Sequence, residues 1–501
     1  PELRLPELAH HPLAALQAYL EGRRAYRHGQ YADAIRYLRS ALDRDSTFAL
    51  AALYLVDASD WVANGDASWA RDRAWALREG LAPADLAYLT ALVGPHFPAL
   101  PSTAERLNAW ERAAALTPDR SESWYGLGDI LYHRGSVLGA PQAGPRALEA
   151  FRRAASMDSA YAAPLIHLAD IAFDAGETVE ARRLALRYLA LDSTSGIAGY
   201  FRWRLGIETA SRPATSLSGL SSDGLFRVAV ASQLSGVGVA DGQRAAQELV
   251  NRAVTATELA ATRRLRWLVA INMGRMDDLA RFLGEVTNEE ARPLRLAHLF
   301  GDGDPDWDTG SRDTTLFDRY IAILESLWRD GSSSETDLSA LRRELRERPE
   351  AWTQAADIEL TALVQCRGQS PAASHAIARL DSLIAASPLD SDWDAYRPLL
   401  LARCHEWRGD LPAALAALRR RPNEAWAGLP YLATFRREEG RVALQLKDTT
   451  SAIRAWTRYL NLRASADPVA VPERERIRAA LAPLLARPSA PRGDRRILIP
   501  G

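Results

Sequence analysis

Lysine is almost absent from this chain, and its scarcity excludes several kinds of enzyme. Of the 62 basic residues, all but Lys447 are arginine. A P-loop, a Schiff-base enzyme and a protein kinase each need a lysine at a defined place, and Lys447 follows no glycine-rich loop and has no V-A-I-K context. The kinase signatures H-R-D-L-x-x-x-N and D-F-G are missing as well. We therefore expect no phosphoryl transfer and no cofactor in this chain.

Cysteines and long apolar runs are also scarce. Cys366 and Cys404 are the only two cysteines and lack a CxxC partner, so neither a zinc site nor a disulfide framework is expected. We interpret them as two helix-packing thiols, and a single bridge between them stays open. The longest apolar stretches fall far short of the roughly 20 residues that cross a bilayer, so no transmembrane helix is expected.

Neither sign of charge dominates the sequence. The 62 basic and 63 acidic residues give a net charge of -1, which argues against direct binding of nucleic acid through counterion release. The chain begins at Pro1 and shows no basic region followed by an apolar segment, so we expect a fragment or a processed product. Its compartment stays open between the cytoplasm and the outer side of a membrane-anchored parent.

The sequence predicts no metal site. One acidic run alternates as the first ligands of an EF-hand loop do, at Asp302, Asp304, Asp306 and Asp308. Trp307 stands where that loop needs glycine, and Asp313 stands where it needs glutamate, so a solvated acidic loop is the better interpretation. The nine histidines form no HExxH motif. His133 and His167 are interpreted as packing or groove residues, because no second ligand is expected at helical spacing from either of them.

What the sequence has instead is a repeated pattern. From Ser121 onward, a large apolar residue, a Leu-Gly pair, a turn glycine and an Ala-x-x-x-aromatic-x-x-Ala motif follow one another. The residues are Trp124, Leu127, Gly128, Gly135, Ala147, Phe151 and Ala154. This order is typical of a tetratricopeptide (TPR) unit of about 34 residues, in which two antiparallel helices approach closely at small residues. Gly128 is therefore expected to face a neighbouring helix.

The same pattern recurs near both ends of the chain. It is visible over Gly22–Leu42, Leu401–Leu418 and Gly440–Leu460, and Glu473–Ala486 is expected to cap the last repeat. The sequence therefore predicts an all-α fold, a tetratricopeptide-like α-solenoid forming a right-handed superhelix of antiparallel helix pairs. We expect an N-terminal array over 1–208, an irregular helical middle over 209–350, a C-terminal array with its cap over 351–487 and an extended tail over 488–501.

Two stretches go beyond the general repeat pattern. Leu16–Leu50 and Ser123–Thr194, which contain EGRRAYRHGQYADAIRYL and WYGLGDILYHRG, resemble the TPR region of large bacterial regulatory proteins. In that group the repeats follow a serine/threonine kinase domain or a winged-helix transcriptional activator domain. The resemblance implies a sensory or scaffolding module that binds a protein or peptide partner, and it implies no catalytic residue here.

Two alternatives to a sensory module stay open. One is the scaffold half of a transcriptional activator. The other, suggested by the fourteen tryptophans, is an α/α-toroid enzyme that acts on carbohydrates with two carboxylates and aromatic platforms. The repeat length of about 34 residues favours TPR units, and no paired acids stand out from the many others.

The partner is expected to bind in the concave groove. Residues on the first helix of each repeat, away from the packing positions, line that face of a TPR superhelix. In three repeats the candidates are Tyr19, Arg23, Tyr26, Arg27, Tyr125, Asp129, Tyr132, His133, Ile166, Asp170 and Phe173. Tyrosine and arginine are enriched at binding hot spots, and the change from basic Arg23 to acidic Asp170 suggests an extended segment bound in one direction.

Overall fold

The computed structural model describes residues 8–62, 67–208, 217–275, 295–296, 299–301, 315–329, 334–386, 394–421 and 428–486. Within these ranges the regular structure is entirely helical and no strand is present, which confirms the all-α prediction. The chain divides into two compact units, one up to Arg227 and one from Val228 onward. The division at 1–208, 209–350, 351–487 and 488–501 stays a prediction.

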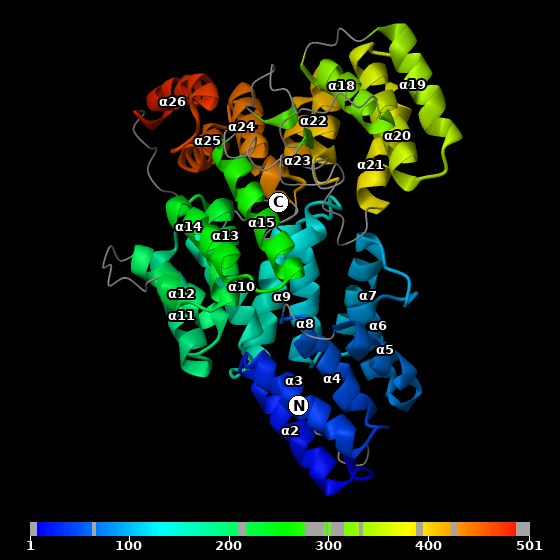
Figure 1. Ribbon diagram of the computed structural model, residues 1–501, viewed down its shortest axis with the longest axis vertical. Coiled ribbons are helices and arrows are strands. Elements are labelled where there is room, and N and C mark those ends of the chain that lie inside the picture. Colours follow the sequence, from blue (N-terminus) through cyan, green and yellow to red (C-terminus); the bar gives the residue numbers. More distant parts are fainter. Residues whose placement is uncertain are drawn as a thin grey trace. The chain divides into compact units, whose positions relative to one another are not determined.

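The first unit is a run of helix pairs (Figure 1). Each helix packs on the next along the chain, and short turns make consecutive helices antiparallel. The helices are α2 (Leu13–Arg27), α3 (Tyr31–Arg44), α4 (Ala49–Ser59), α5 (Ala67–Ala76), α6 (Pro83–Val93), α7 (Thr103–Leu116), α8 (Ser121–Ile130), α9 (Ala143–Met157), α10 (Ala163–Ala175), α11 (Thr178–Leu191) and α12 (Gly196–Glu208). A π-helical turn, η2 (Leu131–Gly135), continues α8. Helix α13 (Ser222–Ser235) contains the boundary between the units.

The second unit repeats this arrangement. Its helices are α14 (Val239–Arg252), α15 (Ala256–Met273), α18 (Leu316–Arg329), α19 (Glu335–Glu347), α20 (Ala351–Arg367), α21 (Ala373–Ala386), α22 (Arg397–Trp407), α23 (Leu411–Arg419), α24 (Leu429–Gln445), α25 (Thr449–Leu462) and α26 (Val471–Leu485). The pairs α14–α15, α20–α21, α22–α23 and α24–α25 pack side by side, and α26 packs on α25. Part of the middle segment is thus also built from helix pairs. The role of α26 as a cap stays a prediction.

Local sequence explains where these helices begin and end. At the start of α7, the Ser102 hydroxyl accepts from the Glu105 amide, and the Glu105 carboxylate accepts from the Ser102 amide at 2.8 Å, which is a capping box. At the end of α10, Gly176 has a φ of +75°, a left-handed conformation that glycine adopts without the steric cost of a Cβ. Gly409 ends the turn after α22 with a φ of +76°.

Glycines opposite large side chains set the distance between helices. A Cβ on Gly126 of α8 would lie 2.2 Å from the indole of Trp110 on α7, and one on Gly128 would lie 2.8 Å from the Phe151 ring on α9. In the second unit, a Cβ on Gly440 would lie 2.2 Å from the Trp456 indole. At all three contacts the two helices therefore approach to a distance that only glycine permits.

The second unit also buries ion pairs. Glu439 on α24 is almost completely buried and pairs with Arg421 at 3.0 Å and with Arg436 at 3.3 Å. Burial alone would raise the pKa of the Glu439 carboxyl, but these arginines lower it to about 2. Cys366 and Cys404, on α20 and α22, are both buried free thiols, as their interpretation as packing residues predicted.

Two other sequence features have simple outcomes. The acidic run Asp302–Asp308 lies outside the described residues, so its interpretation as a solvated loop stays a prediction. Among the described residues, no helix combines the length and the apolarity needed to cross a bilayer. Gly128 does face a neighbouring helix, as the repeat phase predicted.

Gly128→Leu should destabilise the first unit. The new side chain would overlap the fully buried ring of Phe151, and overpacking of this kind costs about 1–3 kcal/mol. Gly206→Leu is the matched control, because Gly206 lies in α12 with no atom within 4 Å of its Cβ position. Its stability should be unchanged or raised by up to about 1 kcal/mol through helix propensity. Equal melting temperatures for the two variants would contradict the observed packing of α8 on α9.

Candidate functional site

The predicted groove residues lie on three helices of the first unit and differ in exposure. They occupy α2, α8 with η2, and α10, which are first helices of their pairs. The buried members are Tyr19, Tyr26, Tyr125, Tyr132, Ile166 and Phe173. The partly exposed members are Arg23, Arg27, Asp129, His133 and Asp170. The polar members therefore form the accessible part of the predicted groove, while its aromatic members belong to the core.

The buried tyrosines contact one another and not an open channel. The Tyr26 ring lies 6.1 Å from that of Tyr54 on α4 and 6.0 Å from that of Tyr161, just before α10. The Tyr26 and Tyr161 hydroxyls are 3.1 Å apart, and Tyr125 lies 5.7 Å from Tyr161. The first helices of non-consecutive pairs thus meet, because the array curves enough for α2 to reach the segment before α10. We call Tyr26, Tyr54, Tyr88, Tyr125 and Tyr161 the tyrosine cluster.

Ion pairs hold α2 in this position. Arg23 donates to Glu122 of α8 at 2.8 Å, and Arg27 donates to Asp158, while the Ala162 amide donates to the Arg27 carbonyl at 2.8 Å. Burial alone would raise the pKa of the Glu122 carboxyl, but the Arg23 guanidinium lowers it below its ordinary value. The basic end of the predicted groove therefore has counterions within the chain.

The acidic end of the groove lies beside α12. The Asp170 carboxylate accepts from the Tyr200 hydroxyl at 2.6 Å, and the Arg204 guanidinium lies over the Phe173 ring at 4.8 Å. These contacts orient α10 side chains toward the next helix pair. The Arg23 end and the Asp170 end thus have different neighbours along the array.

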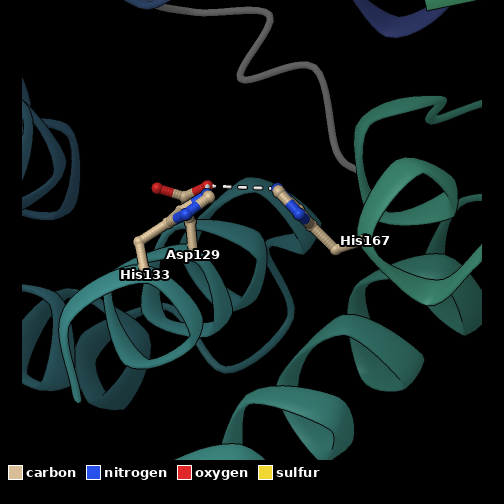
Figure 2. A group of neighbouring side chains, drawn as sticks. All are labelled: Asp129, His133 and His167. Atoms are coloured by element: carbon tan, nitrogen blue, oxygen red, sulfur yellow. Dashed lines mark ion pairs between the residues drawn. The ribbon is translucent and has the colours of Figure 1, made fainter. Parts of the chain in front are cut away.

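Between these ends, Asp129, His133 and His167 converge (Figure 2). His133 Nε2 lies 3.4 Å and His167 Nε2 lies 3.3 Å from Asp129 Oδ1. The Tyr125 hydroxyl donates to the same oxygen at 3.1 Å. Burial alone would raise the pKa of the Asp129 carboxyl, but the two histidines lower it well below its ordinary value. These are three side chains of types that bind metal ions, one carboxylate and two imidazoles, and they come from two consecutive repeats.

Sequence reasoning missed this group and part of the tyrosine cluster. Asp129 stands four residues before His133, which is helical spacing, so the statement that His133 lacks a second ligand at that spacing was wrong. The proximity of His167 could not be read from the sequence, because it depends on how two repeats pack. Asp57 and Glu122, which are buried beside the tyrosine cluster, carried no sequence signal.

The described residues also leave an open hollow of about 270 Å³ between α9, α10 and α11. Leu168 and Leu184 form part of its floor, and Arg152, Arg183 and Glu180 stand at its sides. Its lining comes from α9, α10 and α11, whereas Arg23 and Arg27 lie on α2. No predicted groove residue lines it.

Comparison with known proteins adds little to this description. No protein-family profile and no curated protein matches the chain. Among solved structures, a crystal structure of the P58(IPK) TPR domain is matched over 77% of this chain and 95% of its own, at 12% identity and a TM-score of 0.19. The TPR-like fold therefore rests on the helix pairs themselves.

Stability should fall with rising pH because of one buried acid. Asp57 accepts a hydrogen bond from Tyr88, and burial raises the pKa of its carboxyl from 3.8 to about 7. Between those pH values Asp57 ionises in the unfolded chain but not in the folded chain. The free energy of unfolding therefore falls by on the order of 4 kcal/mol as pH rises from about 4 to above 7. Asp57→Asn removes this pH-dependent loss, so the variant should become more stable relative to the parent chain as pH rises over that range.

The measurement is chemical denaturation of both proteins at several pH values. Asp43→Asn on the exposed side of α3 serves as the control and should follow the parent chain throughout. A constant stability difference between Asp57→Asn and the parent chain from pH 4 to pH 8 would contradict the assigned burial of a neutral Asp57.

Proposed function

We propose that this chain is a non-catalytic protein-binding module and the partner-sensing part of a larger bacterial regulatory protein. The observation that carries the proposal is the shared face of α2, α8 and α10, first helices of three pairs, whose accessible side chains carry both signs of charge. Such a face suits an extended peptide with alternating complementary charges. A TPR-like array of helix pairs is itself typical of interaction scaffolds.

Of the predicted groove residues, only the polar ones are accessible on this face. Arg27 and Asp129 have 31% and 39% of their side chains exposed, and Asp170 is partly exposed on α10. The tyrosine cluster adjoins the first two of these charges, since Tyr26 precedes Arg27 on α2 and the Tyr125 hydroxyl donates to Asp129 at 3.1 Å. We therefore propose that a partner contacts the charged edge first and that the tyrosines support it from below.

Several contacts argue against the carbohydrate-active alternative. Among the described acids on the inner side of the first unit, Asp57 accepts from Tyr88 and Glu122 pairs with Arg23. A glycosidase needs two carboxylates facing one open cleft. The single lysine, Lys447, lies in the turn between α24 and α25, away from any glycine-rich loop. These features favour binding over catalysis.

The larger protein is the part of the proposal that rests on resemblance. A kinase domain with a membrane helix, or a winged-helix activator domain, encoded before Pro1 would select one of the two kinds of parent. A signal peptide at that place would favour a secreted enzyme. Sequencing the gene upstream of this segment distinguishes the three.

Peptide binding can be tested without a known partner. A display library of random 12-residue peptides is selected on the purified chain, and the dissociation constants of enriched peptides are measured by fluorescence anisotropy. Arg27→Ala combined with Asp170→Ala should weaken peptide binding at least about tenfold. Each substitution removes a charged side chain whose hydrogen bond to the peptide contributes up to about 1.5–3 kcal/mol.

The control has the same pair of residue types elsewhere. Asp33→Ala with Arg36→Ala removes an exposed ion pair of α3 and should leave the peptide affinities unchanged. Circular dichroism checks that all three proteins keep their helix content. If the selected peptides bind the Arg27 and Asp170 double variant as tightly as the parent chain, the proposed face is not the binding site.

A further inference from the structure

A carboxylate and two imidazoles from two consecutive repeats come together at one point. Asp129 lies in the last turn of α8, His133 lies in the π-helical turn that follows, and His167 lies on α10 (Figure 2). Their nearest ligand atoms all lie within 4.8 Å of one another. The chain positions that supply them are 38 residues apart at most, about the length of one repeat, so ordinary stacking of repeats brings them together.

The separations between the ligand atoms leave room for a shared ion. Charge-assisted N–H···O bonds cluster at about 2.7–2.9 Å, whereas Asp129 Oδ1 lies 3.4 Å from His133 Nε2 and 3.3 Å from His167 Nε2. Zinc binds imidazole nitrogen and carboxylate oxygen at about 2.0–2.2 Å, and the edge of such a tetrahedron is roughly 3.3–3.4 Å. The two N···O distances therefore match two edges of a zinc tetrahedron.

The surroundings fix the orientation of these side chains. The buried His167 ring stacks on Phe151, with ring centroids 4.8 Å apart and planes 21° apart. The Tyr125 hydroxyl donates to Asp129 at 3.1 Å, as the outer partners of metal-binding carboxylates do. The π-helical turn that carries His133 is a rare conformation that recurs at functional sites.

From this geometry we propose that Asp129, His133 and His167 form a binding site for a divalent transition metal ion, with zinc as the fitting ion. Two nitrogen ligands and one carboxylate oxygen suit zinc and its neighbours, whereas magnesium prefers oxygen ligands throughout. Three protein ligands leave the fourth position for water or for a donor from a partner. The bound ion would link the repeat of α8 to that of α10.

The site is also accessible to an ion. His167 is only 6% exposed, but 25% of the His133 side chain and 39% of the Asp129 side chain reach solvent. An ion can thus enter from the side of Asp129.

The test uses the full chain without an affinity tag, stripped of metal with a chelator. Isothermal titration with zinc should give one ion per chain, and cobalt(II) should give the intense visible bands of a tetrahedral complex. His133→Ala and Asp129→Asn should each weaken zinc binding about a hundredfold, since even loss of an outer partner costs 10–100-fold. Neither position is sealed in the core, so both variants should keep their helix content by circular dichroism.

The matched control is His96→Ala. His96 Nε2 also lies 3.4 Å from a carboxylate, that of Glu105, but it is 71% exposed, and the described part of the chain places no third ligand beside this pair. Zinc binding should therefore not change. Equal zinc affinity in His133→Ala, His96→Ala and the parent chain would overturn the proposal and indicate zinc on other histidines, such as His10 and His11. Weak octahedral cobalt bands, or magnesium competing with zinc at similar concentration, would overturn it as well.

Discussion

The close approach of helices at glycine is the constraint on which the rest of this structure depends. Gly126 faces the Trp110 indole, Gly128 faces Phe151, and in the second unit Gly440 faces Trp456. At each contact the glycine has no side chain, and an aromatic ring of the neighbouring helix fills the space that its Cβ would take. The backbones of the two helices can therefore lie nearer than two ordinary side chains allow. Helix pairs held at this distance are the repeating element of both units.

Curvature follows from these repeated close contacts, and it decides which residues reach solvent. In a repeat array, small rotations between neighbours add up along the chain. In the first unit they bring α2 back to the segment before α10, where Tyr26 meets Tyr161 and Arg27 meets Asp158. The surface that an open superhelix would offer to a partner is therefore partly filled by the chain's own tyrosines. Its charged residues remain at the edge.

The sequence predicted the contacts that depend on residue spacing within one repeat. It did not predict the burial that depends on how several repeats curve together. The helix pairs and the role of Gly128 follow from local patterns, and the structure confirms them. The burial of Tyr26 and Tyr125 depends on curvature over four helix pairs, which no local pattern encodes. The Asp129 and His133 pair lies between these cases, because its spacing was visible and only the approach of His167 needed the structure.

In the first unit, α2 contacts the segment before α10, and a double-mutant cycle on Tyr26 and Tyr161 tests this contact most directly. Tyr26→Phe and Tyr161→Phe each keep the ring and remove one side of the hydrogen bond between their hydroxyls, which are 3.1 Å apart. The unfolding free energies of the single and double variants should show a coupling of about 0.5–1.5 kcal/mol. Strictly additive effects would contradict the account, because they would mean that α2 does not reach the segment before α10.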